Sequence, residues 1–119
     1  MYAIVTKEKG ITVVEVTAPG RILDQEVCPA LEEQIQAAAD GADPPIVLVD
    51  LPHSDYFSNA FNRVLANVWR SLKQRDGQLA LSSLNEPCRQ MINNLHLDTI
   101  WAVFETRDEA ISELSGSKE

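Results

Sequence analysis

The segment that most constrains the fold is the apolar run IVLVDL at residues 46–51. Only Asp50 interrupts it, whereas a strand with one face in water alternates between apolar and polar residues. Such a run is typical of a central strand that is covered on both faces, as in a parallel sheet packed between helices. The chain is therefore predicted to be an α/β protein with this strand inside its sheet.

An amphipathic helix is predicted directly after this strand, over residues 58–75, with Ser58 as its N-cap candidate. Its apolar positions follow a helical period and should be buried: Phe61, Val64, Leu65, Val68 and Leu72. The polar positions that fall away from this stripe should be exposed: Asn59, Asn62, Arg63, Asn67 and Arg70. Trp69, beside the stripe, is expected to belong to the core, as is Trp101 in a later strand.

A hairpin and a helix are predicted before the apolar run. Residues 2–6 and 11–17 are rich in β-branched side chains and flank a turn at residues 9–10. The helical period of the apolar residues over 27–39 predicts a helix, for which Asp24 is the N-cap candidate. The polar loop between the apolar run and the following helix then lies at the carboxyl end of the sheet, where sites in α/β proteins usually form.

The C-terminal part alternates in the same way. A strand is predicted over residues 78–82, a helix capped by Asn85, a strand over 100–104 and a last helix capped by Thr106. The order β-β-α-β-α-β-α-β-α implies a mixed, mainly parallel sheet with right-handed crossovers and one antiparallel N-terminal edge strand. We expect a single domain over residues 1–114 and a disordered tail at 115–119.

Charge and composition exclude several classes of function. The chain has 10 Lys and Arg against 18 Asp and Glu, a net charge of -8, which disfavours nucleic acid and anionic membrane surfaces as partners. No apolar run approaches the ~20 residues that span a bilayer, and the N-terminus does not resemble a signal peptide. Cys28 and Cys88 fit no metal-ligand spacing and are expected to be free thiols. A cytoplasmic location is expected.

The sequence gives little support for catalysis. His53 lies near Asp50 and Asp55 in the sequence and has the chemistry of a general base or metal ligand, but we interpret it as a solvated loop histidine. Asp24, Asp50 and Asp55 are candidates to meet at the carboxyl end of the sheet and bind a cation, yet hard cations need more oxygen ligands than these. No enzyme activity, cofactor or metal is therefore predicted.

Several short motifs occur in an order known from one family. Residues 20–24 (GRILD) are similar to that family's turn, in which a glycine is followed by a hydrophobic residue and an aspartate. Residues 46–51 are similar to one of its strands. Residues 81–98 and 103–110 follow that family's strand, helix, "GLD", strand and "EEA" ending, with His96 in place of the usual Gly. By these motifs the chain resembles the STAS domain family, the anti-sigma-factor antagonists and their relatives, over nearly its whole length.

The resemblance implies a phosphorylation site at the strand-to-helix junction. Family members carry an Asp-Ser-Ser-Gly-type motif there, and a partner kinase phosphorylates one hydroxyl, which releases the partner. We place the family's motif on this sequence by counting residues without gaps, forward from Asp50 and backward from Gly77. The phosphoacceptor then falls on Asn59, which has no hydroxyl. A one-residue slip puts it at Ser58 instead. The ungapped count agrees from both sides and is preferred, so phosphorylation control is predicted to be lost.

The resemblance also implies a protein partner: a switch-kinase or anti-sigma-type ATPase, or a larger regulatory assembly. The partner-binding residues predicted from it are Asp24, Ser54, Asp55, Ser58, Asn59, Arg63 and Arg70. Two alternatives stay open. STAS-like domains also serve as accessory subunits of transporters, and the start of the helix over 58–75 is a potential nucleotide or anion site. The sequence does not fix the oligomeric state.

Overall fold

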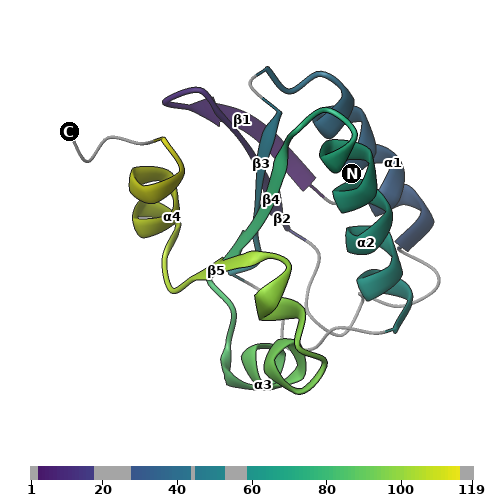
Figure 1. The fold of residues 1–119 in the computed structure, drawn as a ribbon, viewed down its shortest axis with the longest axis vertical. Helices are drawn as coiled ribbons and strands as arrows, with labels where there is room; N and C mark the ends of the chain where they lie inside the picture. Colours follow the sequence, from purple (N-terminus) through teal and green to yellow (C-terminus); the bar gives the residue numbers. More distant parts are fainter. Residues whose placement is uncertain (1–2, 18–27, 44, 53–58, 116–119) are drawn as a thin grey trace.

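The computed structural model describes residues 3–17, 28–43, 45–52 and 59–115 (Figure 1). At its centre is a five-stranded sheet in the order β1-β2-β3-β4-β5, in which only the first pair is antiparallel. The strands are β1 (Ala3–Glu8), β2 (Ile11–Val16), β3 (Ile46–Asp50), β4 (Gln78–Ser82) and β5 (Ala102–Phe104). The predicted central strand is thus the middle strand of the sheet, and the predicted fold class is confirmed.

Helices cover both faces of this sheet. Two long helices lie side by side on one face, and the C-terminal helix lies on the other (Figure 1). The helices are α1 (Cys28–Asp40), α2 (Asn59–Lys73), α3 (Glu86–Asn94) and α4 (Arg107–Leu114), with a 3₁₀ turn, η2, at Leu97–Thr99 that the sequence did not predict. Residue 100 and Trp101 belong to no strand, so β5 is shorter than expected.

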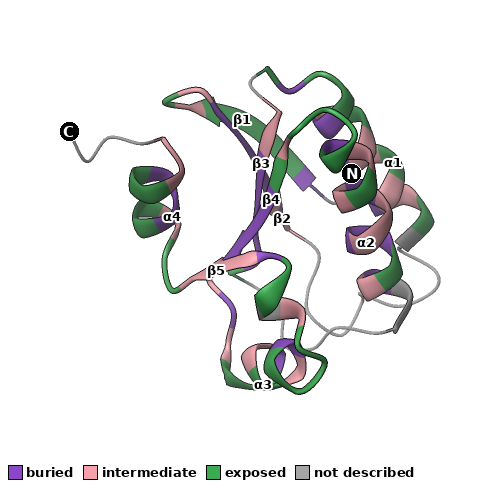
Figure 2. Cartoon of the chain, viewed as in Figure 1, coloured by how far each residue is buried: buried purple, intermediate pink, exposed green. Residues whose placement is uncertain are grey.

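The larger core lies between the sheet and helices α1 and α2 (Figure 2). All five residues of the predicted stripe on α2 are buried in it, which confirms the helical period. Trp101 is also buried there and Trp69 packs against it, so both tryptophans belong to the core as predicted. A smaller apolar cluster under α4 contains Leu48, Ala110 and Ile111. Because both faces of β3 are covered, its run of apolar residues has no polar alternation.

The predicted caps of the last two helices are present. The Cys88 N–H donates to Oδ1 of Asn85 at 3.1 Å, and the Glu109 N–H donates to Oγ1 of Thr106 at 3.1 Å. Each bond satisfies one of the N–H groups that a helix start leaves unpaired. The other two predicted caps, Asp24 and Ser58, lie outside the described residues.

His96 should be replaceable by glycine with a gain in stability. Its φ is 58°, a left-handed conformation that costs an L-residue about 1–2 kcal/mol and costs glycine nothing. The greater freedom of glycine in the unfolded chain offsets part of the gain. We expect His96→Gly to raise the free energy of unfolding by about 0.5–1 kcal/mol in urea denaturation. His96→Ala keeps the Cβ and should give no such gain; an equal gain from both variants would contradict the explanation.

Candidate protein-binding site

The junction between β3 and α2 lies at the carboxyl end of the parallel strands. β3 ends at Asp50 and α2 begins at Asn59. In doubly wound α/β sheets this edge is where binding sites usually form. Of the predicted partner-binding residues, the structure describes three, all on α2: Asn59 in its backbone, and Arg63 and Arg70. The other four, together with His53, lie outside the described residues. They are Asp24, Ser54, Asp55 and Ser58.

The outward face of α2 is basic. Arg63 and Arg70 are exposed, as predicted, and their spacing of two helical turns places both on the same side of the helix. Arg70 donates to Oδ1 of Asn67 at 3.0 Å. Lys73 adds a third cation, and α2 contains no acidic residue, although the chain as a whole has a net charge of -8. A surface of this kind favours contact with an acidic protein surface.

Two asparagines predicted to be exposed on α2 are half-buried instead. Nδ2 of Asn67 donates to Oε2 of Glu32 on α1 at 3.1 Å. Nδ2 of Asn62 donates to the sulfur of Met91 on α3 at 3.6 Å. Both residues border the apolar stripe, and neighbouring helices cover that border, so the expectation of exposure was wrong for them. They position α2 against its neighbours.

Asp50 points to the opposite face of the sheet from α2. It follows Leu48 at a spacing of two residues, which places both side chains on the face covered by α4. Its carboxylate is buried, accepts a hydrogen bond from Oγ of Ser82 at 2.8 Å, and lies 3.8 Å from Nη1 of Arg107. The structure thus assigns Asp50 to partners under α4. In the described part of the chain no group of three His, Cys, Asp or Glu residues is arranged to hold a metal ion.

Arg107, at the start of α4, is the centre of a charged cluster that the sequence analysis missed. Its guanidinium pairs with Glu8, with Glu15 at 3.3 Å and with Asp50. Burial lowers the pKa of Arg107, but the hydrogen bond and charge of Glu8, with the charges of Asp50 and Glu15, outweigh burial, so its pKa is raised above the ordinary value. No local pattern reveals this cluster, because Arg107 and its partners are distant in sequence.

The STAS domain family model matches residues 2–110 of the chain. The chain belongs to the STAS domain family. An anti-sigma-factor antagonist (STAS) domain protein from Planctomyces limnophilus is 27% identical, with a TM-score of 0.84, over 95% of this chain and 97% of that protein. An anti-sigma factor antagonist from Mycobacterium paratuberculosis is 25% identical, with a TM-score of 0.79, over 93% and 91% of the two chains. These bacterial structures have the fold described above.

A third structure shares only the fold with this STAS domain. The sulfate transporter family protein from Wolinella succinogenes is 13% identical, with a TM-score of 0.71, over 95% of this chain and 93% of that chain. A search of proteins with curated function found no significant match. None of the helices among the described residues is long and apolar enough to cross a membrane.

A second arginine fixes how α1 and α2 of the STAS domain lie together. Arg75 follows α2, and its guanidinium donates to the carbonyl oxygens of Ala39 and Ala42 at 2.6 Å each and of Asp40 at 3.3 Å. These carbonyls belong to the end of α1, where a helix leaves C=O groups unpaired and favours positive charge. These hydrogen bonds of Arg75 thereby fix the position of α2 along the axis of α1.

Proposed function

We propose that this STAS domain is a regulatory protein-binding domain of the anti-sigma-factor-antagonist kind, and that it is not phosphorylated at the family position. The observation that carries the proposal is that α2 begins at Asn59, the residue on which the ungapped count places the phosphoacceptor. The family match over residues 2–110 and the two anti-sigma-factor antagonist structures support the class. The domain acts by binding and needs no catalytic group or cofactor.

The physical effect of an acceptor at this place explains why its loss matters. A phosphate at a helix start accepts hydrogen bonds from unpaired N–H groups, so it is stable there. It also adds about two negative charges, which must lose their hydration when a protein partner covers the surface. An asparagine carries no hydroxyl and stays neutral. The domain therefore remains competent to bind its partner, a switch-kinase or anti-sigma-type ATPase or a regulatory assembly that contains one.

Intact mass after incubation with such a kinase and ATP tests the switch. We expect the wild-type domain to gain no phosphate. Asn59→Ser, which restores a hydroxyl at the family position, should gain one phosphate and serves as the matched control for kinase activity and recognition. A stoichiometric phosphate on Ser58 of the wild-type chain would overturn the proposal, because it would place the acceptor one residue earlier.

The binding surface is proposed to include the basic face of α2 together with the predicted residues around it, Asp24, Ser54, Asp55, Ser58 and Asn59. We expect Arg63→Glu and Arg70→Glu each to weaken partner binding at least tenfold, that is by about 1.4 kcal/mol or more, measured by calorimetry. The reason is that a like charge then faces the acidic surface of the partner. Lys9→Glu, in the β1–β2 turn, makes the same change in net charge and should leave binding within about twofold.

Equal weakening by the Lys9 and α2 variants would show a net-charge effect and contradict the assignment of the surface. The partner itself is identified by affinity capture with the wild-type domain as bait and the Arg63→Glu variant as control. A kinase-like ATPase recovered only by the wild-type bait supports the proposed class. A transporter-type ATPase in its place would overturn it and favour the accessory-subunit alternative.

A further inference from the structure

Strand β1 forms one edge of the sheet. It pairs with β2 on one side, and in the described part of the chain no strand pairs with its other side. Ile4 and Val5, in the middle of β1, are each 49% exposed although both are large apolar side chains. An exposed apolar edge strand is a ready template for pairing with a further strand.

The turn after β1 decides which of its backbone groups point outward. Lys9 and Gly10 form a two-residue turn, and both have positive φ, 53° and 84°. In such hairpins the residues that flank the turn are hydrogen-bonded to each other, and bonded pairs then alternate along the ladder. The residues of β1 that bond to β2 are therefore Glu8, Thr6 and Ile4. Those whose N–H and C=O groups point to the open side are Ala3, Val5 and Lys7.

The outward groups of β1 are complementary to those of a second copy. When two β1 strands run antiparallel with Val5 opposite the partner's Val5, Ala3 of each lies opposite Lys7 of the other. Every outward N–H and C=O then has a partner, and the two valines cover each other. The two lysines are four residues apart along the ladder, about 13 Å, which exceeds the screening length of about 8 Å at physiological ionic strength.

Helix α1 brings a negative charge to the same place. Lys7 points to the face of the sheet that α1 covers, since its ammonium donates to the carbonyl oxygen of Asp43, just after α1, at 3.1 Å. Because α1 connects the parallel strands β2 and β3, it runs antiparallel to β2 and in the direction of β1. Ala3 lies about 13 Å before Lys7, a distance that about nine helical residues span, so Ala3 is level with Glu33.

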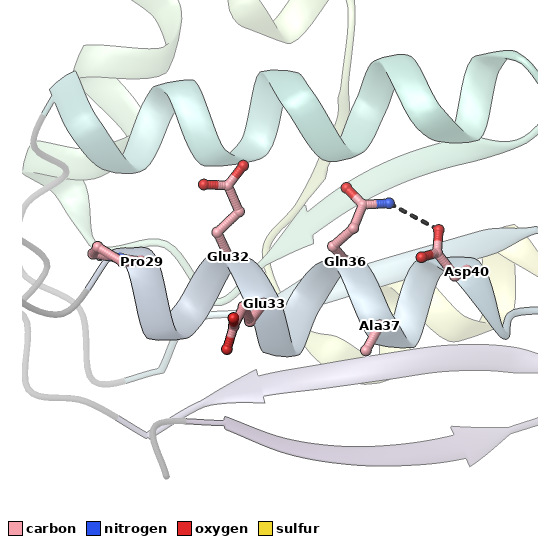
Figure 3. Close-up of a pocket in the computed structure, with 6 residues that line it drawn as sticks. All are labelled: Pro29, Glu32, Glu33, Gln36, Ala37 and Asp40. Carbon is pink, nitrogen blue, oxygen red and sulfur yellow. Dashed lines mark hydrogen bonds between the residues drawn. The ribbon is translucent and has the colours of Figure 1, made fainter.

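Glu33 is available for a charge on the partner. It is exposed, and no ion pair in the described part of the chain uses it. Figure 3 shows that it points away from α2, beside a hollow of about 400 Å³ along α1. Since Ala3 lies opposite the partner's Lys7, that ammonium is level with Glu33. The twofold symmetry repeats this pair of opposite charges on the other side of the axis.

We propose that two copies of this chain dimerise through β1, which joins their five-stranded sheets into one continuous sheet about a twofold axis at Val5. The axis is perpendicular to the sheet, so the helices of both protomers keep their own faces. α1 contacts β1 and β2, whereas α2 contacts β4, so the arginines of α2 stay uncovered in the dimer. The net charge of -8 on each copy opposes association, so the dimer is weak and reversible.

Analytical ultracentrifugation over a wide concentration range tests the dimer. We expect a monomer–dimer equilibrium for the wild-type chain. Val5→Lys and Val5→Glu each set two like charges opposite each other at the axis and should weaken dimerisation at least tenfold. An equimolar mixture of these two variants sets opposite charges there and should form a heterodimer within about threefold of wild type. A monomer at every concentration, or a mixture that associates no better than its components, would overturn the proposal.

Leu95→Lys is the matched control for the charge variants. Leu95, which follows α3, is 52% exposed and so resembles Val5 in exposure, but it lies far from β1 in sequence and belongs to no strand. Its substitution should leave the monomer–dimer equilibrium within about twofold of wild type. Equal weakening by Leu95→Lys and Val5→Lys would show that general surface hydrophobicity, and not the β1 edge, drives association.

A proline scan of β1 tests the backbone pairing. Val5→Pro removes an N–H that points to the open side, a place where an edge strand tolerates proline, so the domain should stay folded and become at least tenfold weaker as a dimer. Ile4→Pro removes an N–H that bonds to β2 and should destabilise the domain in urea denaturation. The opposite pattern, with Ile4→Pro tolerated and Val5→Pro unfolded, would contradict the assignment of the outward groups.

Calorimetry with the partner of the proposed function separates the two proposals. Val5→Lys leaves α2 unchanged, so its affinity for that partner should stay within about twofold of wild type. Arg63→Glu should dimerise as the wild-type chain does, since α2 lies away from β1. Loss of partner binding in Val5→Lys would show that the β1 edge belongs to the partner's site and would overturn its assignment to a second copy.

Discussion

Replacing Gly77 with alanine is expected to destabilise the domain by about 3 kcal/mol, the upper end of the cost of overpacking. A Cβ at this position would lie 2.3 Å from the carbonyl oxygen of Pro45 and 2.9 Å from that of Leu72. Both are backbone atoms, so neither can move aside as a flexible side chain does. The backbone just before β3 or the end of α2 must shift instead.

The close backbone contacts of Gly77 belong to the turn that connects α2 to β4. The Gly77 N–H donates to the carbonyl of Leu72 at 2.7 Å, and the next N–H, of Gln78, donates to Pro45 at 3.0 Å. These bonds end α2 and start β4 beside β3. The turn itself uses Asp76 at a φ of 58°. A shift at Gly77 would therefore change how α2, with its exposed arginines, sits on the sheet.

Gly41→Ala is the matched control. Its added Cβ would meet only the Ala37 carbonyl oxygen, at 3.7 Å, which is ordinary van der Waals contact. We expect its free energy of unfolding in urea to stay within about 0.5 kcal/mol of wild type. Similar losses for the two variants would show that the effect comes from the general glycine-to-alanine change and not from the backbone contact.

The sequence was sufficient for those parts of the fold that depend on neighbouring residues. The apolar run at residues 46–51 and the stripe on α2 specify burial through periodicity, which needs no tertiary information. The caps Asn85 and Thr106 bond to N–H groups three residues away, so local sequence is enough to place them. The order and types of the five strands and four α-helices follow from such patterns, whereas the turn η2 and the start of β5 do not.

The tertiary polar contacts did not follow from the sequence. Asp50 was considered with Asp24 and Asp55 as a possible cation ligand, but its side chain is directed to Ser82 and Arg107 under α4. Arg75 resembled an ordinary helix-end residue, yet it bonds to the end of α1. In each case the partner is more than thirty residues away in sequence. Periodicity places a residue on a face, but it does not say which charged group faces it.

Replacing Arg107 with methionine is expected to cost about 2 kcal/mol of stability. Methionine keeps much of the apolar contact but leaves Glu8, Glu15 and Asp50 without their shared cation. Removing one partner of a buried pair costs about 3–5 kcal/mol, and the estimate is lower here because the Arg107 side chain is 27% exposed. Urea denaturation near neutral pH measures it.

The direction of the pKa shift of Arg107 decides how its contribution to stability depends on pH. The pKa of Arg107 is raised in the folded state. Its contribution to stability is therefore fully present below the ordinary arginine pKa and is lost only as the pH rises through the higher folded value. Near neutral pH the wild-type cluster is fully formed. The deficit of Arg107→Met near neutral pH therefore measures the whole contribution of the arginine charge.

Arg89→Met is the control for removing an arginine from an ion pair. Arg89 lies 3.4 Å from Glu105, whose side chain is 73% exposed. Exposed pairs contribute about 0–1 kcal/mol, so we expect a loss below about 0.5 kcal/mol in the same measurement. If the two arginine variants lose equal stability, the cluster under α4 is no stronger than a surface pair. A larger loss at Arg107 alone shows that α4 is held on the sheet by charge as well as by its short apolar face.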